Sequence, residues 1–362
     1  MAKKINPSTK LRVKRSAELS RSHHTEYNQS IKKAIIPIAG LGTRFLPLSK
    51  ILPKEFWPVV DKPVLQYIIE EAIASGIKKI VFIKKPGKNG PSAYLENYFK
   101  EDGKLKNILK RRGKENILKE VKYLEEIPKK SHFSFAVQKE PLGASHAVFQ
   151  AKKLIKKDES VAVLWGDDLV ESKIPCLLQL IKIFNKYRKP IIALYKLPKE
   201  KIYSYGVVKA KKIEDRVYKI EKIVEKPKPQ EAPSNLAIVG KYIITPKVLK
   251  YLEGINFKRK EDFGLSEALG EMIEEGEEIY GYEFEGKWLE CGNKSAYLET
   301  NLYLSLKHPQ FGKKLKNFLR KKGFNADVVE LADTLVSEAK GRKPVRVQVS
   351  PSAPTFAPQK KS

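Results

Sequence analysis

The sequence predicts an α/β protein with a doubly wound, Rossmann-like sheet, mixed but mainly parallel, and a small antiparallel extension. Between residues 34 and 195, short apolar runs typical of buried strands alternate with stretches of helical periodicity. Strands that alternate with helices form parallel βαβ units. Beyond about residue 203, strand-like runs follow one another with only turns between them, which indicates antiparallel pairing. Ligands of doubly wound sheets bind at the carboxyl ends of the parallel strands, so we expect functional residues there.

The predicted elements follow from apolar spacing. In the first half we expect strands at 34–38, 79–83, 133–137, 160–165 and 191–195. The helices expected there are 63–75, 92–100, a basic helical insertion that continues to about 123, 142–155 and 176–187. Gly76 follows the first of these helices as a C-terminal cap would. In the second half we expect the strands of the extension at 205–208, 220–224, 237–244 and 280–284, and helices at 266–275 and 295–308.

The chain's 362 residues suit two domains or one large α/β domain. We expect a flexible basic segment over 1–31, a main domain over 32–312 and a basic tail over 313–362. The main domain should have two halves, one at about 32–200 and the other at about 201–312. The two cysteines, Cys176 and Cys291, are too few for a disulfide scaffold or a four-thiolate zinc site. Neither a transmembrane run nor a signal-peptide pattern occurs, so we expect a cytoplasmic protein with no membrane partner.

The net charge of +29 raises the question of a nucleic-acid partner. Residues 1–33 contribute +7 and residues 313–362 contribute +8, so the two ends hold about half of the excess. Between the two ends of the chain, most lysines are spaced along amphipathic stretches such as 104–122, which is typical of a solvated helical face. We therefore expect no nucleic-acid partner, and salt-dependent binding to RNA would support the alternative.

A glycine-rich turn follows the first predicted strand, with the sequence Ala39-Gly40-Leu41-Gly42-Thr43-Arg44. It matches neither the dinucleotide fingerprint nor the mononucleotide P-loop. Gly40 and Gly42 allow the backbone to approach a flat or anionic ligand, and the Arg44 guanidinium suits phosphate oxygens. The turn therefore predicts a cradle for a phosphate or a base, although a tight strand-to-helix turn would use the same glycines.

The loop after this turn is rich in prolines and cations: Leu46-Pro47-Leu48-Ser49-Lys50, then Pro53-Lys54-Glu55, then Pro58-Val59-Val60-Asp61-Lys62-Pro63. Prolines fix the path of a loop, and the cations suit a triphosphate. Residues 40–63 resemble the long signature of the sugar-1-phosphate nucleotidyltransferases, most closely the bacterial UTP–glucose-1-phosphate uridylyltransferases. The resemblance covers about residues 32–310. It implies the nucleotide-diphospho-sugar transferase type of fold, an antiparallel extension that binds the sugar, and a homo-oligomer.

Further segments match this family in order. Gln138 with Pro141-Leu142-Gly143 and His146-Ala147 resembles the segment that reads uracil, and Tyr205-Gly206-Val207, Glu225-Lys226-Pro227 and residues 234–240 resemble the sugar-phosphate half. Trp165-Gly166-Asp167-Asp168 ends a strand, where a carboxylate can hold Mg²⁺. An N-cap pair that opens the next helix is the alternative for these two aspartates. Cys291-Gly292-Asn293-Lys294 matches a last conserved segment.

The resemblance implies a role for each candidate residue. Glu225 would accept hydrogen bonds from sugar hydroxyls, and Lys226 would neutralise the sugar's phosphate. The full set comprises catalytic Arg44 and Lys54; nucleotide-binding Ala39, Gly40, Leu41, Gly42, Gln138, Gly143 and Ser145; sugar-phosphate-binding Gly206, Glu225, Lys226 and Asn235; and the metal ligands Asp167 and Glu290.

Three positions depart from the family pattern. Ser145 stands where a glycine is expected near the base, Glu290 replaces an aspartate, and Gly264 lies where the sugar pocket has a glutamine. These departures leave three alternatives open: dTTP in place of UTP, another sugar 1-phosphate, or a protein that binds nucleotide sugars without turnover.

The expected reaction is attack of a glucose 1-phosphate oxygen on the α-phosphorus of UTP, with Mg²⁺ as cofactor and UDP-glucose and pyrophosphate as products. The nucleophile is already ionised at neutral pH, so no general base is needed. Positioning and charge neutralisation then account for catalysis.

The tail predicts no activity. Residues 325–357 resemble the translation of a tRNA gene: Val347-Gln348-Val349 can be encoded by bases that contain the T-loop consensus, and Ser352-Ala353-Pro354 by bases that end in CCA. A reading frame that continues into an adjacent tRNA gene would explain this. The alternative is a short helix over 328–339 followed by a disordered arm.

Overall fold

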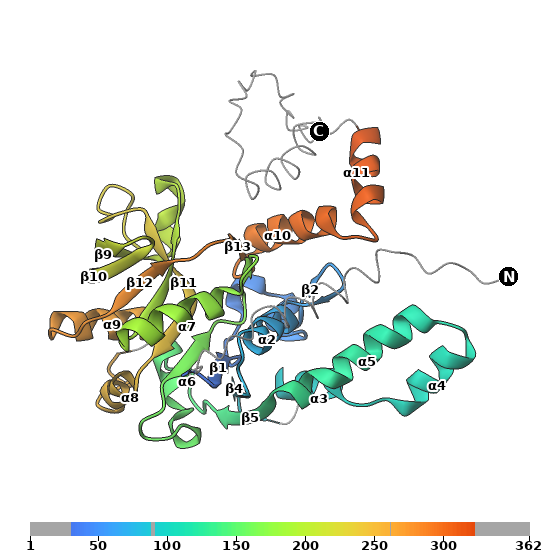
Figure 1. The fold of residues 1–362 in the computed structure, drawn as a ribbon, viewed down its shortest axis with the longest axis horizontal. Helices are drawn as coiled ribbons and strands as arrows, with labels where there is room; N and C mark the ends of the chain where they lie inside the picture. The colour runs from blue at the N-terminus through green and yellow to red at the C-terminus, as the bar shows by residue number, and fades with distance from the viewer. Residues whose placement is uncertain (1–29, 88–90, 261, 323–362) are drawn as a thin grey trace, which may run out of the picture. The chain divides into compact units, whose positions relative to one another are not determined.

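The computed structural model describes residues 30–87, 91–260 and 262–322 (Figure 1). The chain separates into two compact units, Met1–Asn301 and Leu302–Ser362. Residues 1–29 of the predicted basic segment 1–31 and all of the tRNA-like tail lie outside the described residues. Both cysteines are buried and free of disulfides.

Nine strands of the described residues form one mixed sheet in the order β5-β4-β1-β6-β11-β8-β12-β10-β9. Strands β1, β4, β5 and β6 are mutually parallel, whereas β11 runs antiparallel to both of its neighbours β6 and β8. The bounds are β1 Lys33–Pro37, β4 Lys79–Lys84, β5 His132–Val137, β6 Val161–Leu164, β8 Ile191–Lys196, β9 Gly206–Glu214, β10 Val217–Glu225, β11 Leu236–Ile244 and β12 Tyr280–Glu283. A mixed sheet is confirmed.

The position of β11 corrects one expectation. Residues 237–244 were predicted in the antiparallel extension, but β11 lies in the middle of the sheet, between β6 and β8. All nine of its residues are buried, as expected for a strand covered on both faces. The extension itself consists of β9 and β10. It is joined to the sheet through β12, which pairs parallel with β8 and antiparallel with β10, and through an antiparallel contact of β9 with β11.

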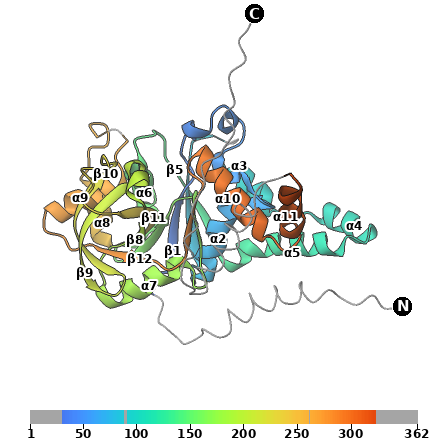
Figure 2. The same cartoon turned by 90° about the horizontal axis from the view of Figure 1, so that it is seen from above.

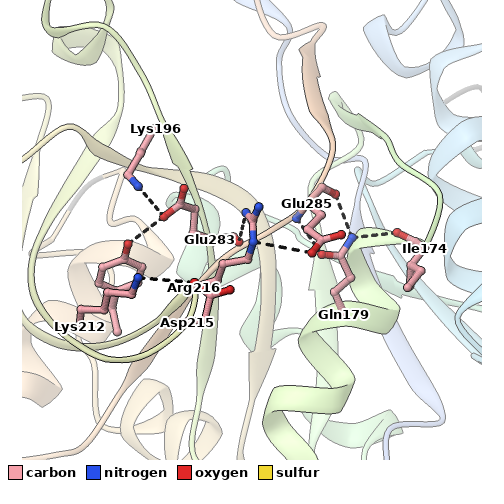
Figure 3. Close-up of polar contacts among 9 residues, drawn as sticks. Ile174, Gln179, Lys196, Lys212, Asp215, Arg216, Glu283 and Glu285 are labelled. Atoms are coloured by element: carbon pink, nitrogen blue, oxygen red, sulfur yellow. Dashed lines mark hydrogen bonds and ion pairs between the residues drawn. The ribbon is translucent and has the colours of Figure 1, made fainter. Parts of the chain in front are cut away.

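Polar contacts among residues of β8, β10 and β12 connect this extension to the rest of the sheet (Figure 3). The Glu283 carboxylate at the end of β12 pairs with Lys196 of β8 at 2.9 Å and accepts a hydrogen bond from the Tyr218 hydroxyl of β10 at 2.8 Å. Just beyond, the Glu285 backbone N–H donates to Gln179 Oε1 at 2.8 Å. The extension is therefore bound to both the sheet and a covering helix.

Helices connect the strands much as predicted. They are α2 Val64–Ala74, α3 Pro91–Phe99, α4 Gly103–Arg111, α5 Glu115–Lys130, α6 Ala144–Phe149, α7 Cys176–Tyr187, α8 Pro246–Glu253, α9 Leu265–Glu274, α10 Lys294–Lys307 and α11 Gly312–Lys321. In Figure 2, α8 and α9 lie at the end of the sheet with β9 and β10, and the α4–α5 pair lies at the other end. No helix of the described ranges has the length and hydropathy to cross a bilayer.

Two differences from the predicted helices have local causes. The helix expected over 142–155 is only α6 followed by a 3₁₀ turn at Lys152–Leu154, because Gly143 has a φ of +95° and the helix begins after it. The helix α8 was not predicted, although Thr245 and Pro246 form the N-cap and first-turn proline typical of a helix start.

A buried ion pair joins β11 to the helices beneath it. The Lys241 side chain is fully buried, and its Nζ lies 2.9 Å from Glu71 Oε2 of α2. The other Glu71 oxygen accepts a hydrogen bond from the Leu177 backbone N–H, at 3.0 Å, in the first turn of α7. Removal of one charge would leave the other buried without an opposite charge, which costs more than the pair itself contributes.

We expect Lys241→Met to lower the free energy of unfolding by about 3–5 kcal/mol, because it leaves the Glu71 carboxylate uncompensated. The double variant Glu71→Gln/Lys241→Met should recover much of this loss, since glutamine still accepts the Leu177 N–H. Urea unfolding of the three proteins measures both effects. A loss below about 1 kcal/mol in the single variant would show that the pair is not essential to this packing.

Candidate functional site

The glycine-rich turn lies at the carboxyl end of β1, as predicted. Ala39 is buried, whereas Gly40 is exposed and has no atom within 4 Å of the position a Cβ would take. Leu41 is also exposed. Gly42 adopts a φ of +65°, and its carbonyl accepts a hydrogen bond from Ser49 Oγ at 2.8 Å. The backbone of the turn is therefore accessible, and the hydrogen bond from Ser49 in the following loop holds it in place.

Lys54 is directed into the molecule by a short 3₁₀ turn, Lys54–Phe56. Its ammonium donates a hydrogen bond to Asp167 Oδ2, which follows β6. Burial alone would lower the pKa of Lys54, but Asp167 and Glu55 raise it above its ordinary value. Lys54 is thus a fixed, permanently charged cation at the carboxyl end of the sheet.

A two-stranded antiparallel sheet, β7 Asp168–Glu171 and β13 Lys287–Glu290, brings the acidic residues together. Glu290 lies opposite Asp168 in its register, and the Cys291 backbone N–H donates to the Asp167 carbonyl at 2.8 Å. Because Asp168 begins a strand, the two aspartates are not the N-cap pair of a helix. The predicted metal ligands Asp167 and Glu290 therefore lie on adjacent segments.

The side chains of these acids border one small space, which we call the Gly292 hollow. A Cβ placed on Gly292 would lie 3.2 Å from Asp167 Oδ2, 3.2 Å from Glu290 Oε1 and 3.7 Å from Arg44 Nη1. The Arg44 guanidinium also donates to the Gly292 carbonyl at 3.4 Å. Only glycine leaves this space free, so two carboxylates and a guanidinium can meet there.

Burial and neighbouring charges shift the pKa values of the two aspartates in opposite directions. Burial would raise the pKa of Asp167, but the Lys54 ammonium more than offsets it and holds that pKa below its ordinary value. Burial, with Asp167 and Glu290 nearby, raises the pKa of Asp168 to about 7. The Asp168 carboxyl accepts hydrogen bonds from Trp288 Nε1 at 2.8 Å and from the Gly240 N–H at 3.1 Å, so it supports the site from beneath.

The segment expected to read the base lies at the carboxyl end of β5. Gln138 is buried, and its Nε2 donates to the Gly143 carbonyl at 3.0 Å. A Cβ on Gly143 would lie only 2.4 Å from the Phe263 backbone, which explains why glycine is required. Ser145 is fully buried and donates to the Gly264 carbonyl at 2.8 Å. Two departures from the family pattern, Ser145 and Gly264, thus contact each other.

The sugar-phosphate residues gather where β9 and β10 pair. Gly206 lies opposite Glu225 in the register, and the Lys226 N–H donates to the Tyr205 carbonyl at 3.1 Å. Ser266, at the start of α9, donates from its hydroxyl to Glu225 Oε2 at 3.0 Å. Asn235 is exposed just before β11.

Tyr205 connects this group to the acidic residues, because its hydroxyl donates to Glu290 Oε2. Burial and the Glu290 carboxylate raise the pKa of Tyr205 above its ordinary value, so the hydroxyl stays protonated. Its ring packs on Trp288 with a centroid separation of 4.9 Å. The structure therefore joins the Gly292 hollow to the sugar-phosphate residues through one side chain.

Sequence reasoning did not assign roles to Tyr205, Ser266, Asp168 or Trp288. Trp288 precedes Glu290 by two residues, so strand alternation places both on one face of β13, and this signal could have identified it. Nothing local in the sequence indicates that Tyr205 or Ser266 contacts a predicted site residue.

The donor set of the hollow fits a divalent cation. Two carboxylate oxygens that face one space are hard ligands of the kind that Mg²⁺ prefers. No cluster of three or more His, Cys, Asp or Glu side chains suited to a metal occurs in the part of the chain described. Mg²⁺ commonly uses one or two carboxylates and completes its shell with water and substrate phosphates, so two ligands suffice.

Comparison with known proteins gives a consistent result. The model of the family described as "Nucleotidyl transferase" matches residues 33–305. A UTP–glucose-1-phosphate uridylyltransferase of Staphylococcus epidermidis is 37% identical over 292 residues, which is 81% of this chain and 98% of that protein.

Two solved structures support the same likeness. A UDP-glucose pyrophosphorylase complexed with UDP-glucose aligns with a TM-score of 0.68 and 34% identity, over 77% of this chain and all of that chain. The UDP-glucose pyrophosphorylase of Acinetobacter baumannii aligns with a TM-score of 0.71 and 33% identity, over 80% of this chain and 99% of that chain.

Replacement of the buried Glu55 by glutamine is expected to remove a pH-dependent loss of stability. Burial raises the pKa of Glu55 from 4.5 to about 7, so between these values the folded protein binds more protons than the unfolded chain. The wild type should therefore lose stability relative to Glu55→Gln as pH rises through this window, by about 3 kcal/mol in total. Urea unfolding at pH 5 and pH 8 measures the difference, and identical pH dependence in both proteins would contradict it.

Proposed function

This chain belongs to the nucleotidyl transferase family of UTP–glucose-1-phosphate uridylyltransferases, and from that premise we propose how its residues act. It transfers a uridylyl group from UTP to glucose 1-phosphate and yields UDP-glucose and pyrophosphate. The observation that supports the residue roles best is the meeting of Lys54, Arg44 and Asp167 at the Gly292 hollow, beside the glycine-rich turn.

The chemistry is an in-line displacement. A phosphate oxygen of glucose 1-phosphate forms a bond to the α-phosphorus of UTP, and the bond between that phosphorus and the oxygen bridging to the β-phosphorus breaks. The bridging oxygen leaves with pyrophosphate. The attacking oxygen is already ionised, so the protein has to position the two anions and neutralise their charge.

Lys54 and Arg44 supply that neutralisation. Lys54 pairs with Asp167, and the Arg44 guanidinium reaches the Gly292 carbonyl. Both cations therefore start at the hollow, where the triphosphate and the leaving pyrophosphate need compensation. Charge placed in advance costs no reorganisation during the reaction, and this is the usual source of such catalysis.

Nucleotidyl transferases of this kind generally use a divalent metal. We assign Mg²⁺ here, with Asp167 and Glu290 as its ligands, on the basis of their two oxygens at the Gly292 hollow. When bound, Mg²⁺ would supply charge neutralisation to the phosphates. A glutamate in place of the family's aspartate still directs one oxygen into this space.

The remaining residues divide between the two substrates. We place uracil against Gln138 and Gly143, and the phosphates along the backbone from Ala39 to Gly42. Because the Ser145 hydroxyl is engaged by the Gly264 carbonyl, we propose that it does not contact the base. Glu225 and Asn235 would accept and donate hydrogen bonds to glucose hydroxyls beside Gly206, and Lys226 would bind the sugar's phosphate.

Three wider features complete the proposal. The parallel strands β1, β4, β5 and β6 with their connecting helices support a doubly wound, Rossmann-like nucleotide half. We propose a cytoplasmic enzyme without membrane or nucleic-acid partners, as the resemblance to enzymes that use UTP and glucose 1-phosphate implies. A homo-oligomer is proposed from the family resemblance, and the molar mass in solution tests it.

We expect pyrophosphate release with glucose 1-phosphate to be fastest with UTP when UTP, dTTP, ATP, CTP and GTP are compared. Discrimination against dTTP should be about tenfold or more, because dTTP carries an added C5 methyl group and lacks the 2′-hydroxyl of UTP. Equal rates with UTP and dTTP would contradict uracil recognition, and no release with any nucleotide would contradict the transferase.

Lys54→Ala should reduce kcat about a thousandfold, because it removes a charge from the leaving pyrophosphate. Lys79→Ala, a surface cation at the opposite end of the parallel strands, is the matched control and should retain wild-type turnover. Circular dichroism of both variants establishes that they are folded. A folded Lys54→Ala protein with near-normal kcat would remove Lys54 from the mechanism.

A further inference from the structure

Glu290 is longer by one methylene than the aspartate of the family pattern, and both of its carboxylate oxygens have defined surroundings. Oε1 lies 3.2 Å from the Cβ position of Gly292, facing the hollow. Oε2 accepts a hydrogen bond from the Tyr205 hydroxyl. The two oxygens are thus divided between the metal-binding space and a tyrosine donor.

We propose that Tyr205 is a positioning residue for the divalent metal: its hydroxyl holds Glu290 so that Oε1 faces Asp167 across the Gly292 hollow. This inference rests on the proposed metal site of the transferase. Outer partners that hydrogen-bond to a ligating carboxylate fix its orientation, and their loss commonly costs 10–100-fold in metal affinity or activity.

Tyr205 is well placed for this role because it is itself fixed. Its N–H donates to the Ile202 carbonyl at 3.1 Å, and its carbonyl accepts from the Lys226 N–H at 3.1 Å. Its ring packs edge-on against Trp288. Trp288 in turn donates a hydrogen bond to Asp168, the neighbour of Asp167. Tyr205 and the two proposed metal ligands are therefore connected through Trp288 and Asp168.

The length of Glu290 makes this contact specific to glutamate. An aspartate carboxylate would lie about 1.5 Å closer to the backbone, so it would not span the distance between the Tyr205 hydroxyl and the hollow. Loss of the Tyr205 hydroxyl should therefore weaken metal binding when residue 290 is glutamate and have little effect on it when residue 290 is aspartate. This dependence separates a positioning role from a general contribution to folding.

The same contact places the metal ligand next to the acceptor site. Tyr205 immediately precedes Gly206, which lies opposite Glu225 in the β9–β10 pairing. A displacement of Tyr205 when the sugar phosphate binds would reach Glu290 directly. The Tyr205–Glu290 hydrogen bond therefore links a neighbour of Gly206 directly to a proposed metal ligand.

The test compares wild type, Tyr205→Phe, Glu290→Asp and the double variant. The dissociation constant of Mn²⁺ is measured by electron paramagnetic resonance, with and without UDP-glucose, so that the readout does not depend on turnover. Tyr205→Phe should weaken Mn²⁺ binding about tenfold in the wild-type background. In the Glu290→Asp background it should change the constant less than twofold.

Tyr203→Phe is the matched control, because it removes a hydroxyl from an exposed ring two residues away. It should bind Mn²⁺ as wild type does. In steady state, Tyr205→Phe should raise the Mg²⁺ concentration needed for half-maximal activity more than the KM for glucose 1-phosphate. Thermal unfolding of each variant without metal establishes that the fold is intact.

Several results would overturn the proposal: an equal effect of Tyr205→Phe in both backgrounds, unchanged Mn²⁺ affinity, a rise confined to the KM for glucose 1-phosphate, or no saturable Mn²⁺ site in the wild type. Failure of the proposed function is distinguishable, because it would appear as absence of pyrophosphate release by the wild type with UTP and glucose 1-phosphate.

Discussion

The arrangement of charge at the Gly292 hollow is the constraint on which the site depends. Two carboxylates that face one space repel each other, and Lys54 and Arg44 place positive charge beside that space. The absence of a side chain at Gly292 is equally necessary, because any Cβ would occupy the space that the carboxylate oxygens and the guanidinium share. The anionic substrates of a uridylyltransferase need this kind of preorganised charge.

The fold supplies the hollow from elements that are far apart in the chain. The first parallel strand presents the glycine-rich turn, and Asp167 follows the end of β6. The short β7–β13 sheet then brings residue 290 alongside. Beneath them, the buried Lys241–Glu71 pair joins β11 to α2 and α7. The sheet therefore positions the reacting groups, and the buried ion pair maintains the packing that supports them.

Local patterns predicted most of this architecture, whereas the candidate site residues came from the family resemblance. The bounds of α7, Cys176–Tyr187, were predicted to the residue because a long amphipathic period specifies a helix. Local spacing of apolar residues does not determine the order of strands in a sheet. Residues 237–244 were therefore assigned to the extension, although they form β11 in the middle of the sheet. The Tyr205–Glu290 contact joins residues 85 positions apart, and neither residue's neighbours indicate the other. Only the folded chain shows that Glu290, which departs from the family pattern, accepts a hydrogen bond from Tyr205.

The central claim is that a divalent cation binds at the Gly292 hollow between Asp167 and Glu290. The most direct measurement is an anomalous difference map from crystals grown with Mn²⁺ and UDP-glucose. We predict a peak within coordination distance, about 2.0–2.2 Å, of one oxygen of each of these carboxylates. A fully occupied metal peak elsewhere near the nucleotide, with neither carboxylate bound to it, would contradict the account.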